Sequence, residues 1–211
     1  MIFNSSFQPM TEYLDYYDID GNFLWTATRD QVHKQWLWHN TVHCRLYTGD
    51  GKVFFQIRKD TGTFYTTASW HVLAWEDIRQ AFHREVKEEL GIGVDVSDAE
   101  LVSIVPWKQD KIKSDWSEYH DRAKANVYVN KYTWDFEDFD FDENEVSWVV
   151  LVDAQGALDL FKSGEWKILA TIITDTGREE REVDISEFLV APNETYLQKY
   201  WEVLDKIISI T

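Results

Sequence analysis

The sequence predicts a mixed α+β sandwich and not a doubly wound parallel sheet. β-rich segments outnumber helical ones along the chain, and the helices come late or singly. One long amphipathic helix is predicted over residues 76–90, and another closes the chain over residues 194–210. Alternating strands and helices, which a doubly wound sheet requires, are missing from this order.

The first part of the chain reads as two hairpins. Residues 12–29 contain two short β-rich runs around Asp20-Gly21, a strong turn signal. Residues 41–58 repeat the pattern around Gly49-Asp50-Gly51, and residues 52–58 are rich in β-formers. We therefore expect strands on both sides of each turn.

The clearest helix follows. Ile78, Phe82, Val86 and Leu90 recur at steps of four residues and form one apolar stripe. Gly91 stands directly after the last of them, where a helix commonly stops.

The second half adds strands, a short helix and the closing helix. Strands are expected over 100–107, 124–134 and 146–153, a short helix over 154–164, and a hairpin over 166–185 that turns at Asp175 to Gly177. Residues 136–145 are acidic and are expected to form a solvated loop. With no repeat or long linker, residues 1–211 are predicted to form one domain, in which residues 1–30 are an N-terminal hairpin extension and 194–210 the closing helix.

Composition limits the function classes. The 211 residues carry a net charge of −17, which disfavours nucleic-acid polymers and anionic membranes as partners. No apolar run is long enough to span a bilayer, and the N-terminus lacks a signal-peptide pattern. A single cysteine, Cys44, excludes an internal disulfide, so we expect a cytoplasmic protein.

Three glutamates share one region of the predicted helix. Glu85, Glu88 and Glu89 project from neighbouring turns, and like charges at this spacing cost roughly 0.2–0.5 kcal/mol per pair in an isolated helix. Clustered carboxylates suit a hard cation such as Mg²⁺ or Mn²⁺. The spacing alone leaves a second explanation open, which is an ordinary solvated helix face.

The order of residues from Glu76 to Ile92 resembles the Nudix box. Glu76 is followed by seven residues and then by Arg84-Glu85-Val86-Lys87-Glu88-Glu89-Leu90-Gly91-Ile92, and every position matches. The resemblance implies an α/β/α sandwich with a mixed sheet and Mg²⁺- or Mn²⁺-dependent hydrolysis of a diphosphate in a small nucleoside-diphosphate-type substrate. It implies that Glu85, Glu88 and Glu89 bind metal, that Arg84 orients a glutamate, and that Glu76 supports the site.

The general base is left open by the box. A box glutamate or a later carboxylate could serve, and Glu118, Asp142, Glu143 and Glu145 are the candidates.

Residues 28–47 are similar to the Nudix branch that contains isopentenyl-diphosphate isomerase. In that enzyme, histidines of this region join glutamates around a metal, which makes His33, His39 and His71 candidate ligands. The alternative is that His33 and His39 simply pack at a strand edge. The isomerase has Cys-Gly-His before its box, whereas this chain has Ser69-Trp70-His71, so isomerase activity is the least expected function.

Tryptophan stands where this family favours glycine. The box begins with glycine, here Trp70, and Trp75, Trp36 and Trp148 occupy further positions of that kind. Glycine is favoured where φ is positive or where a ligand approaches the backbone closely. This replacement motivates an alternative function, a catalytically weakened ligand-binding or regulatory protein. Exposed aromatic side chains and strand edges would also permit a homodimer.

Overall fold

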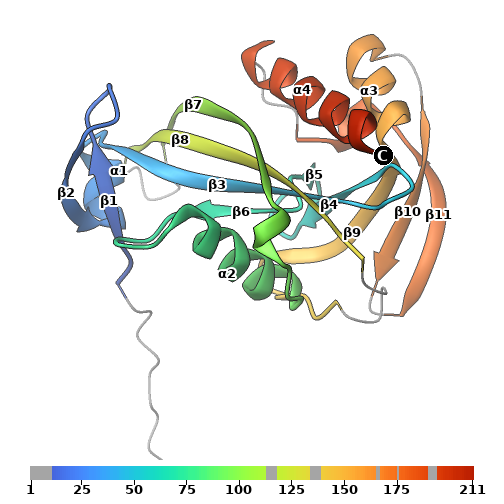
Figure 1. Cartoon of the computed structure of the whole chain (residues 1–211), viewed down its shortest axis with the longest axis horizontal. Helices are drawn as coiled ribbons and strands as arrows, with labels where there is room; N and C mark the ends of the chain where they lie inside the picture. The colour runs from blue at the N-terminus through green and yellow to red at the C-terminus, as the bar shows by residue number, and fades with distance from the viewer. Residues whose placement is uncertain (1–10, 113–117, 134–138, 165–166, 175, 190–193) are drawn as a thin grey trace, which may run out of the picture.

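The computed structural model describes residues 11–112, 118–133, 139–164, 167–174, 176–189 and 194–211. One large sheet lies between helices on its two faces, with α2 (Ile78–Leu90) on one side and α3 (Ala154–Ser163) with α4 (Glu194–Ile210) on the other (Figure 1). The predicted α/β/α sandwich is confirmed. None of the helices in the described residues is both long and apolar enough to cross a membrane.

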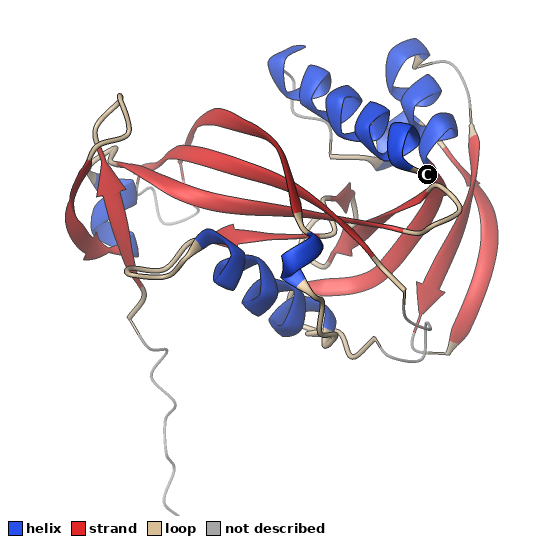
Figure 2. Cartoon of the chain, viewed as in Figure 1, coloured by secondary structure: helices blue, strands red, loops and turns tan. Residues whose placement is uncertain are grey.

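Strands dominate the chain (Figure 2). In the first half they are β1 (Tyr13–Tyr17), β2 (Phe23–Thr28), β3 (Trp38–Tyr47), β4 (Lys52–Arg58), β5 (Phe64–Tyr65) and β6 (Ala68–His71). In the second half they are β7 (Glu100–Ile112), β8 (Glu118–Lys131), β9 (Val146–Asp153), β10 (Ile168–Thr174) and β11 (Gly177–Val183). The remaining elements are the short helix α1 (Arg29–Lys34) and the 3₁₀ turns η1 (Val96–Asp98) and η3 (Ile185–Glu187).

The sheet is mixed because of one strand pair. Its main path runs β11-β10-β9-β4-β3-β1-β2, and β8 pairs in parallel with β3 along residues 39–47. Strand β6 pairs antiparallel with β3 and sets Thr41 opposite His71. Long β3 therefore joins the N-terminal hairpin, the approach to α2 and the β7–β8 hairpin.

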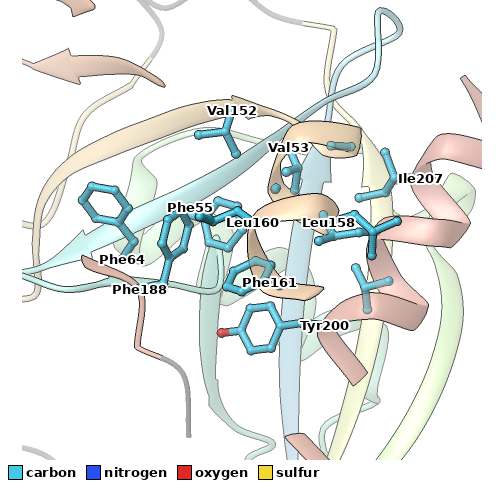
Figure 3. Packing of buried hydrophobic residues seen from close by; sticks show 14 of the residues in the cluster. Val53, Phe55, Phe64, Val152, Leu158, Leu160, Phe161, Phe188, Tyr200 and Ile207 are labelled. Carbon is cyan, nitrogen blue, oxygen red and sulfur yellow. The ribbon is translucent and has the colours of Figure 1, made fainter. Parts of the chain in front are cut away.

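Two apolar layers cover the two faces of the sheet. On the side of α3 and α4, Phe55, Phe64 and Phe161 each lie edge-on to Phe188, with ring centroids 5.0–5.1 Å apart (Figure 3). On the α2 side, the buried stripe Ala81, Phe82, Val86 and Leu90 packs on the sheet with Val42 and Phe54. The apolar period of residues 78–90 thus predicts the helix and its buried face correctly.

Both ends of α2 are capped. The Asp77 side chain accepts a hydrogen bond from the helix N-terminus and forms a capping box with Gln80. Gly91 ends the helix at φ 72°, and a Cβ there would collide with the backbone of Asp140. Glycine is required at this position by both conformation and space.

The acidic segment does more than form a solvated loop. Residues 136–138 lie outside the described residues, but Phe139 and Phe141 pack on the α2-side core. The N–H groups of Asp140 and Asp142 donate to the carbonyls of Leu90 and Glu89 at 3.0 Å. Charge alone therefore predicted a solvated loop and missed the contacts by which this segment holds the end of α2.

The sequence patterns missed several short elements and underestimated the length of two strands. Helix α1 and strands β5 and β6 are only 6, 2 and 4 residues long, too short for a periodic pattern. Strands β7 and β8 extend into a polar hairpin that an apolar pattern does not mark. The structure agrees with the predictions for β1–β2, β9, α3, β10–β11 and α4. That residues 1–211 form a single domain stays a prediction.

Candidate active site

Arg84 connects the polar groups of α2. Its Nε and Nη2 donate to the two oxygens of Glu76 at 2.8 and 2.9 Å, and its Nη1 donates to Glu88 at 3.0 Å and to Glu85. Nη2 also donates to the His71 carbonyl at 3.2 Å. Arg84 thus contacts two glutamates of the helix, Glu85 and Glu88, and the bidentate pair with Glu76 fixes the guanidinium itself.

Glu76 bonds the loop before α2 as well as Arg84. Its Oε2 accepts a hydrogen bond from the Leu73 N–H at 3.0 Å, so the carboxylate joins the loop before α2 to the helix. Through Arg84 it also stabilises the end of β6.

Glu89 is buried and held from two strands. Its Oε2 accepts from the Gln56 side chain on β4 at 3.0 Å, and its Oε1 accepts from the Ser69 N–H on β6 at 3.3 Å. Burial, and then the nearby charges of Glu85 and Glu145, raise the pKa of the Glu89 carboxyl well above its usual value. Gln56 was not singled out from the sequence, since nothing local marks it.

Glu85 and Glu88 differ in environment. Glu85 is 3% exposed, and burial raises the pKa of its carboxyl to about 8, although Arg84 opposes the shift. The Glu88 side chain is 59% exposed. The helix therefore brings the three carboxylates to one region, while Arg84 draws Glu85 and Glu88 toward itself.

A small cleft opens beside Glu89. It has a volume of about 190 Å³, and its lining includes Gln56, Arg58, Trp70, Glu89 and Glu145. Sites for small molecules usually occupy roughly 300–1,000 Å³. The Arg29 guanidinium lies 4.4 Å above the Trp70 ring, so a cation stacks on the indole that lines this narrow cleft.

Glu145 is the general-base candidate that lines this cleft. The pKa of its carboxyl is raised, first by burial and then by Asp142. Of the other candidates, Glu118 pairs with His120 at 3.3 Å, Asp142 accepts from Asn144, and Glu143 lines a separate cleft.

Two of the four unusual tryptophans have a glycine-like backbone. Trp36 has φ 61° and Trp75 has φ 62°, in the left-handed region that favours glycine. The Trp36 ring stacks on His120 with centroids 3.9 Å apart, whereas Trp75 is 82% exposed. Trp70 and Trp148 lie in strands β6 and β9 without positive φ. Glycine at 70 would therefore matter for space in the cleft and not for backbone conformation.

His33, His39 and His71 form a buried cluster. One ligand atom from each lies within 4.8 Å of the others, and all three side chains are at most 6% exposed. No other group of three or more His, Cys, Asp or Glu residues in the described part of the chain gathers this closely. Glu85, Glu88 and Glu89 do not form a group of this kind, since Arg84 bonds Glu85 and Glu88 while Glu89 bonds Gln56 and Ser69.

The imidazoles are oriented as metal ligands commonly are. The Nδ1 atoms of His33 and His39 lie 3.0 and 3.1 Å from the carbonyls of His120 and Leu37, which makes each Nδ1 the donor. Each Nε2 then carries a lone pair, and backbone carbonyls that fix the tautomer in this way are typical of ligating histidines.

Charge and burial fit a cation at this cluster. Burial lowers the pKa of His39 to about 4 and the pKa of His71 well below its usual value, so both rings are neutral at pH 7. His39 Nε2, buried and without a hydrogen bond, lies 3.5 Å from Asp121 Oδ1. A lone pair facing a carboxylate is unfavourable unless a cation or proton lies between them, so the donor set of the cluster fits a metal. Asp121 was not predicted.

The remaining histidines and the cysteine have structural environments. His83 is exposed, whereas His120 is only 7% exposed because Trp36 and Asp110 cover it. Cys44 is fully buried in β3, and burial raises the pKa of its thiol. A thiol of this kind is poorly suited to acid–base chemistry.

Sequence comparison decides the family. No protein-family model matches the chain. Over 155 residues it is 30% identical to a Nudix hydrolase of Clostridium acetobutylicum, across 67% of this chain and 70% of that protein. The chain belongs to the Nudix hydrolase family.

Other Nudix proteins agree with this assignment. The Nudix hydrolase YfcD of Escherichia coli is 32% identical over 87 residues, which cover 39% of this chain and 48% of YfcD. The crystal structure of DR0079 from Deinococcus radiodurans matches 73% of this chain and 91% of that protein with a TM-score of 0.50 and 18% identity, which supports the fold alone.

Family membership carries a general chemistry. Nudix hydrolases cleave nucleoside diphosphate derivatives, act on small molecules and generally use divalent metals. In this Nudix hydrolase, Gln56 and the acidic loop hold the Nudix box in place from outside, and Arg84 connects polar groups within it.

Proposed function

We propose that this protein hydrolyses the diphosphate linkage of a nucleoside-diphosphate-type or related small substrate in the cleft beside Glu89. The observation that carries the proposal is the set of three carboxylates on α2: Glu85 and Glu88 bond Arg84, and Glu89 lines a cleft that also contains Arg58. Oxygen ligands of this kind suit Mg²⁺ or Mn²⁺.

Each residue has a role in this proposal. Glu85, Glu88 and Glu89 would hold the divalent cation, which supplies a nucleophilic water of lowered pKa and neutralises charge on the departing phosphate. Gln56 and the Ser69 N–H hold Glu89 in a single orientation. Arg58 and Arg29 offer positive charge to phosphate oxygens in a protein of net charge −17. Glu145 is the group we assign as general base, to accept a proton from the attacking water.

A panel of nucleoside and isoprenoid diphosphates with Mg²⁺ or Mn²⁺ tests this function. Phosphate release from at least one member is expected, and Glu88→Gln should lower the rate by roughly 10²-fold or more. Glu143→Gln is the matched control, because Glu143 is an exposed carboxylate that lines a different cleft. Full activity of Glu88→Gln would contradict the assignment of Glu88 as a metal ligand.

The narrow cleft favours a second candidate function, ligand binding with weakened catalysis. Trp70 occupies the wall of a cleft of about 190 Å³, below the usual range for small-molecule sites. Under this alternative, no diphosphate turns over although one binds tightly. A gain of turnover in Trp70→Gly would show that the indole obstructs an otherwise competent site.

We also propose that His33, His39 and His71 hold a second divalent metal together with Asp121. Three imidazoles, of which His33 and His39 have Nδ1 bonded to a backbone carbonyl, and one carboxylate suit a transition metal such as Mn²⁺ or Zn²⁺. Metal analysis of the purified protein tests this without any substrate. His39→Ala should lose about one equivalent of metal, the exposed His83→Ala should retain it, and equal metal content in both would contradict the assignment.

A further inference from the structure

Strand β2 ends the sheet with an exposed apolar edge. It pairs with β1, and no strand of the described residues lies beyond it in the sheet order. Its side chains Phe23, Leu24 and Trp25 are 52, 51 and 68% exposed. Exposed apolar edges of this kind invite pairing with another chain.

The register shows which backbone groups face outward. The Arg29 N–H donates to the Glu12 carbonyl at 3.0 Å, and this pair continues the register that sets Thr26 opposite Asp15. Hydrogen-bonded and non-hydrogen-bonded pairs alternate in an antiparallel ladder. Counting from Glu12–Arg29, the hydrogen-bonded pairs are Leu14–Ala27 and Tyr16–Trp25, so Thr26 directs its N–H and C=O away from β1.

The other long outer strands are protected against pairing, and β2 is not. Strand β11 has five consecutive charged residues, Arg178 to Glu182. Strand β7 contains Pro106, which lacks a donor, and the charged residues Lys108 and Asp110. Strand β2, with the sequence FLWTAT, has neither a charge nor a proline. Charged residues and proline are the usual means by which proteins block an edge.

The net charge limits the surfaces through which two copies of the protein can associate. Each copy carries −17, so approach through most surfaces is repulsive. The six residues of β2 carry no charge, and its outer edge offers unpaired backbone groups. A second copy of this chain presents the same edge, which is the requirement for a two-fold interface.

We propose that the protein forms a homodimer by antiparallel pairing of β2 with β2 of a second copy, centred on Thr26. The two Thr26 residues exchange N–H···O=C bonds across the two-fold axis, and the sheet becomes continuous through both copies. Residues directly opposite share a face, so the Trp25 indole of each copy packs on Ala27 of the other.

Sedimentation equilibrium over a range of protein concentrations tests the dimer. A monomer–dimer equilibrium is expected, and it should strengthen as salt screens the −17 charges. Trp25→Glu places two carboxylates in the interface and should abolish the dimer. Leu169→Glu is the matched control, because Leu169 is 60% exposed on β10 and should leave the equilibrium unchanged.

A second pair of variants tests the backbone bonds themselves. Thr26→Pro removes the outward N–H without removing a bond to β1, and should weaken dimerisation roughly tenfold. Thr26→Val removes the hydroxyl that donates to Asp15 at 2.6 Å but keeps the N–H, and should dimerise like the parent protein.

Three outcomes would overturn the proposal. They are a protein that remains monomeric at every concentration, a dimer that survives both Trp25→Glu and Thr26→Pro, and a dimer that Ile104→Glu on β7 dissociates while Trp25→Glu does not. Circular dichroism confirms that each variant is folded. None of these measurements depends on hydrolysis, so they stand apart from the test of the enzymatic function.

Discussion

At position 75, a glycine variant should be more stable than an alanine variant, which reverses the usual order. In ordinary helix or strand positions glycine is less stable than alanine by about 0.5–1 kcal/mol, because the unfolded glycine chain has more freedom. At position 75 the backbone has φ 62°, where a side chain costs roughly 1–2 kcal/mol. Subtracting the first term from the second leaves Trp75→Gly more stable than Trp75→Ala by roughly 0–1.5 kcal/mol, with a central value of about 0.75 kcal/mol.

Comparing the two variants removes the contribution of the indole. Trp75 is 82% exposed, and both variants lose the same small contact area. The Trp75 N–H, which donates to Asp15 Oδ2 at 3.0 Å, is present in both. The difference in free energy of unfolding therefore reports the backbone conformation alone.

Urea denaturation followed by circular dichroism measures that difference. Equal m-values would show that both variants unfold from comparable states. The same two substitutions at Leu169, exposed on β10 without positive φ, should give the ordinary order with glycine the less stable. If Trp75→Gly is no more stable than Trp75→Ala, the left-handed backbone at this position does not exist in solution.

Three further outcomes are expected. Gln56→Leu leaves the buried Glu89 Oε2 without its side-chain donor and should lower the free energy of unfolding by about 1–3 kcal/mol, whereas no loss would mean that the bond at 3.0 Å contributes little. Burial raises the pKa of Glu85 from 4.5 to about 8, so between these two pH values the folded state retains a proton that the unfolded state has lost. The free energy of unfolding of the metal-free protein should therefore fall as pH rises through that window, and added Mg²⁺ should offset the fall. The dependence on pH should be weaker in Glu85→Gln, and identical slopes in the parent protein and this variant would contradict the raised pKa. Cys44 should resist a thiol reagent until the protein unfolds, since it is buried with a raised pKa, and rapid labelling of native protein would refute its position in β3.

Local patterns in the sequence sufficed for the parts of the site that lie on one element. Glu76, Arg84, Glu85, Glu88 and Glu89 belong to α2 or its approach, so helical periodicity places them together before any tertiary contact is known. The apolar stripe of the same helix predicts which face is buried.

Other parts of the site depend on strand register, which sequence patterns specify poorly. His39 and His71 come together because β6 pairs with β3, with Thr41 opposite His71, and β6 is only four residues long. Asp121 approaches His39 through the parallel pair of β3 and β8. Gln56 meets Glu89 from a third strand. Each of these contacts joins distant segments, so no local periodicity reports them.

The N-terminal hairpin also changes where a catalytic fragment of this protein can begin. The carbonyl of Tyr13 accepts from the Ala74 N–H at 2.7 Å, and Asp15 accepts from the Trp75 N–H, so β1 holds the loop that leads into α2. Glu12 pairs with Arg29 at 3.1 Å, beside Trp70. A shortened gene that starts after residue 30 would keep the whole Nudix box but lose the strand that positions its entry. In a shortened version of the protein, residues 12–28 therefore belong with the segment that carries the Nudix box, because Glu12 and Asp15 bond Arg29 and the loop before α2.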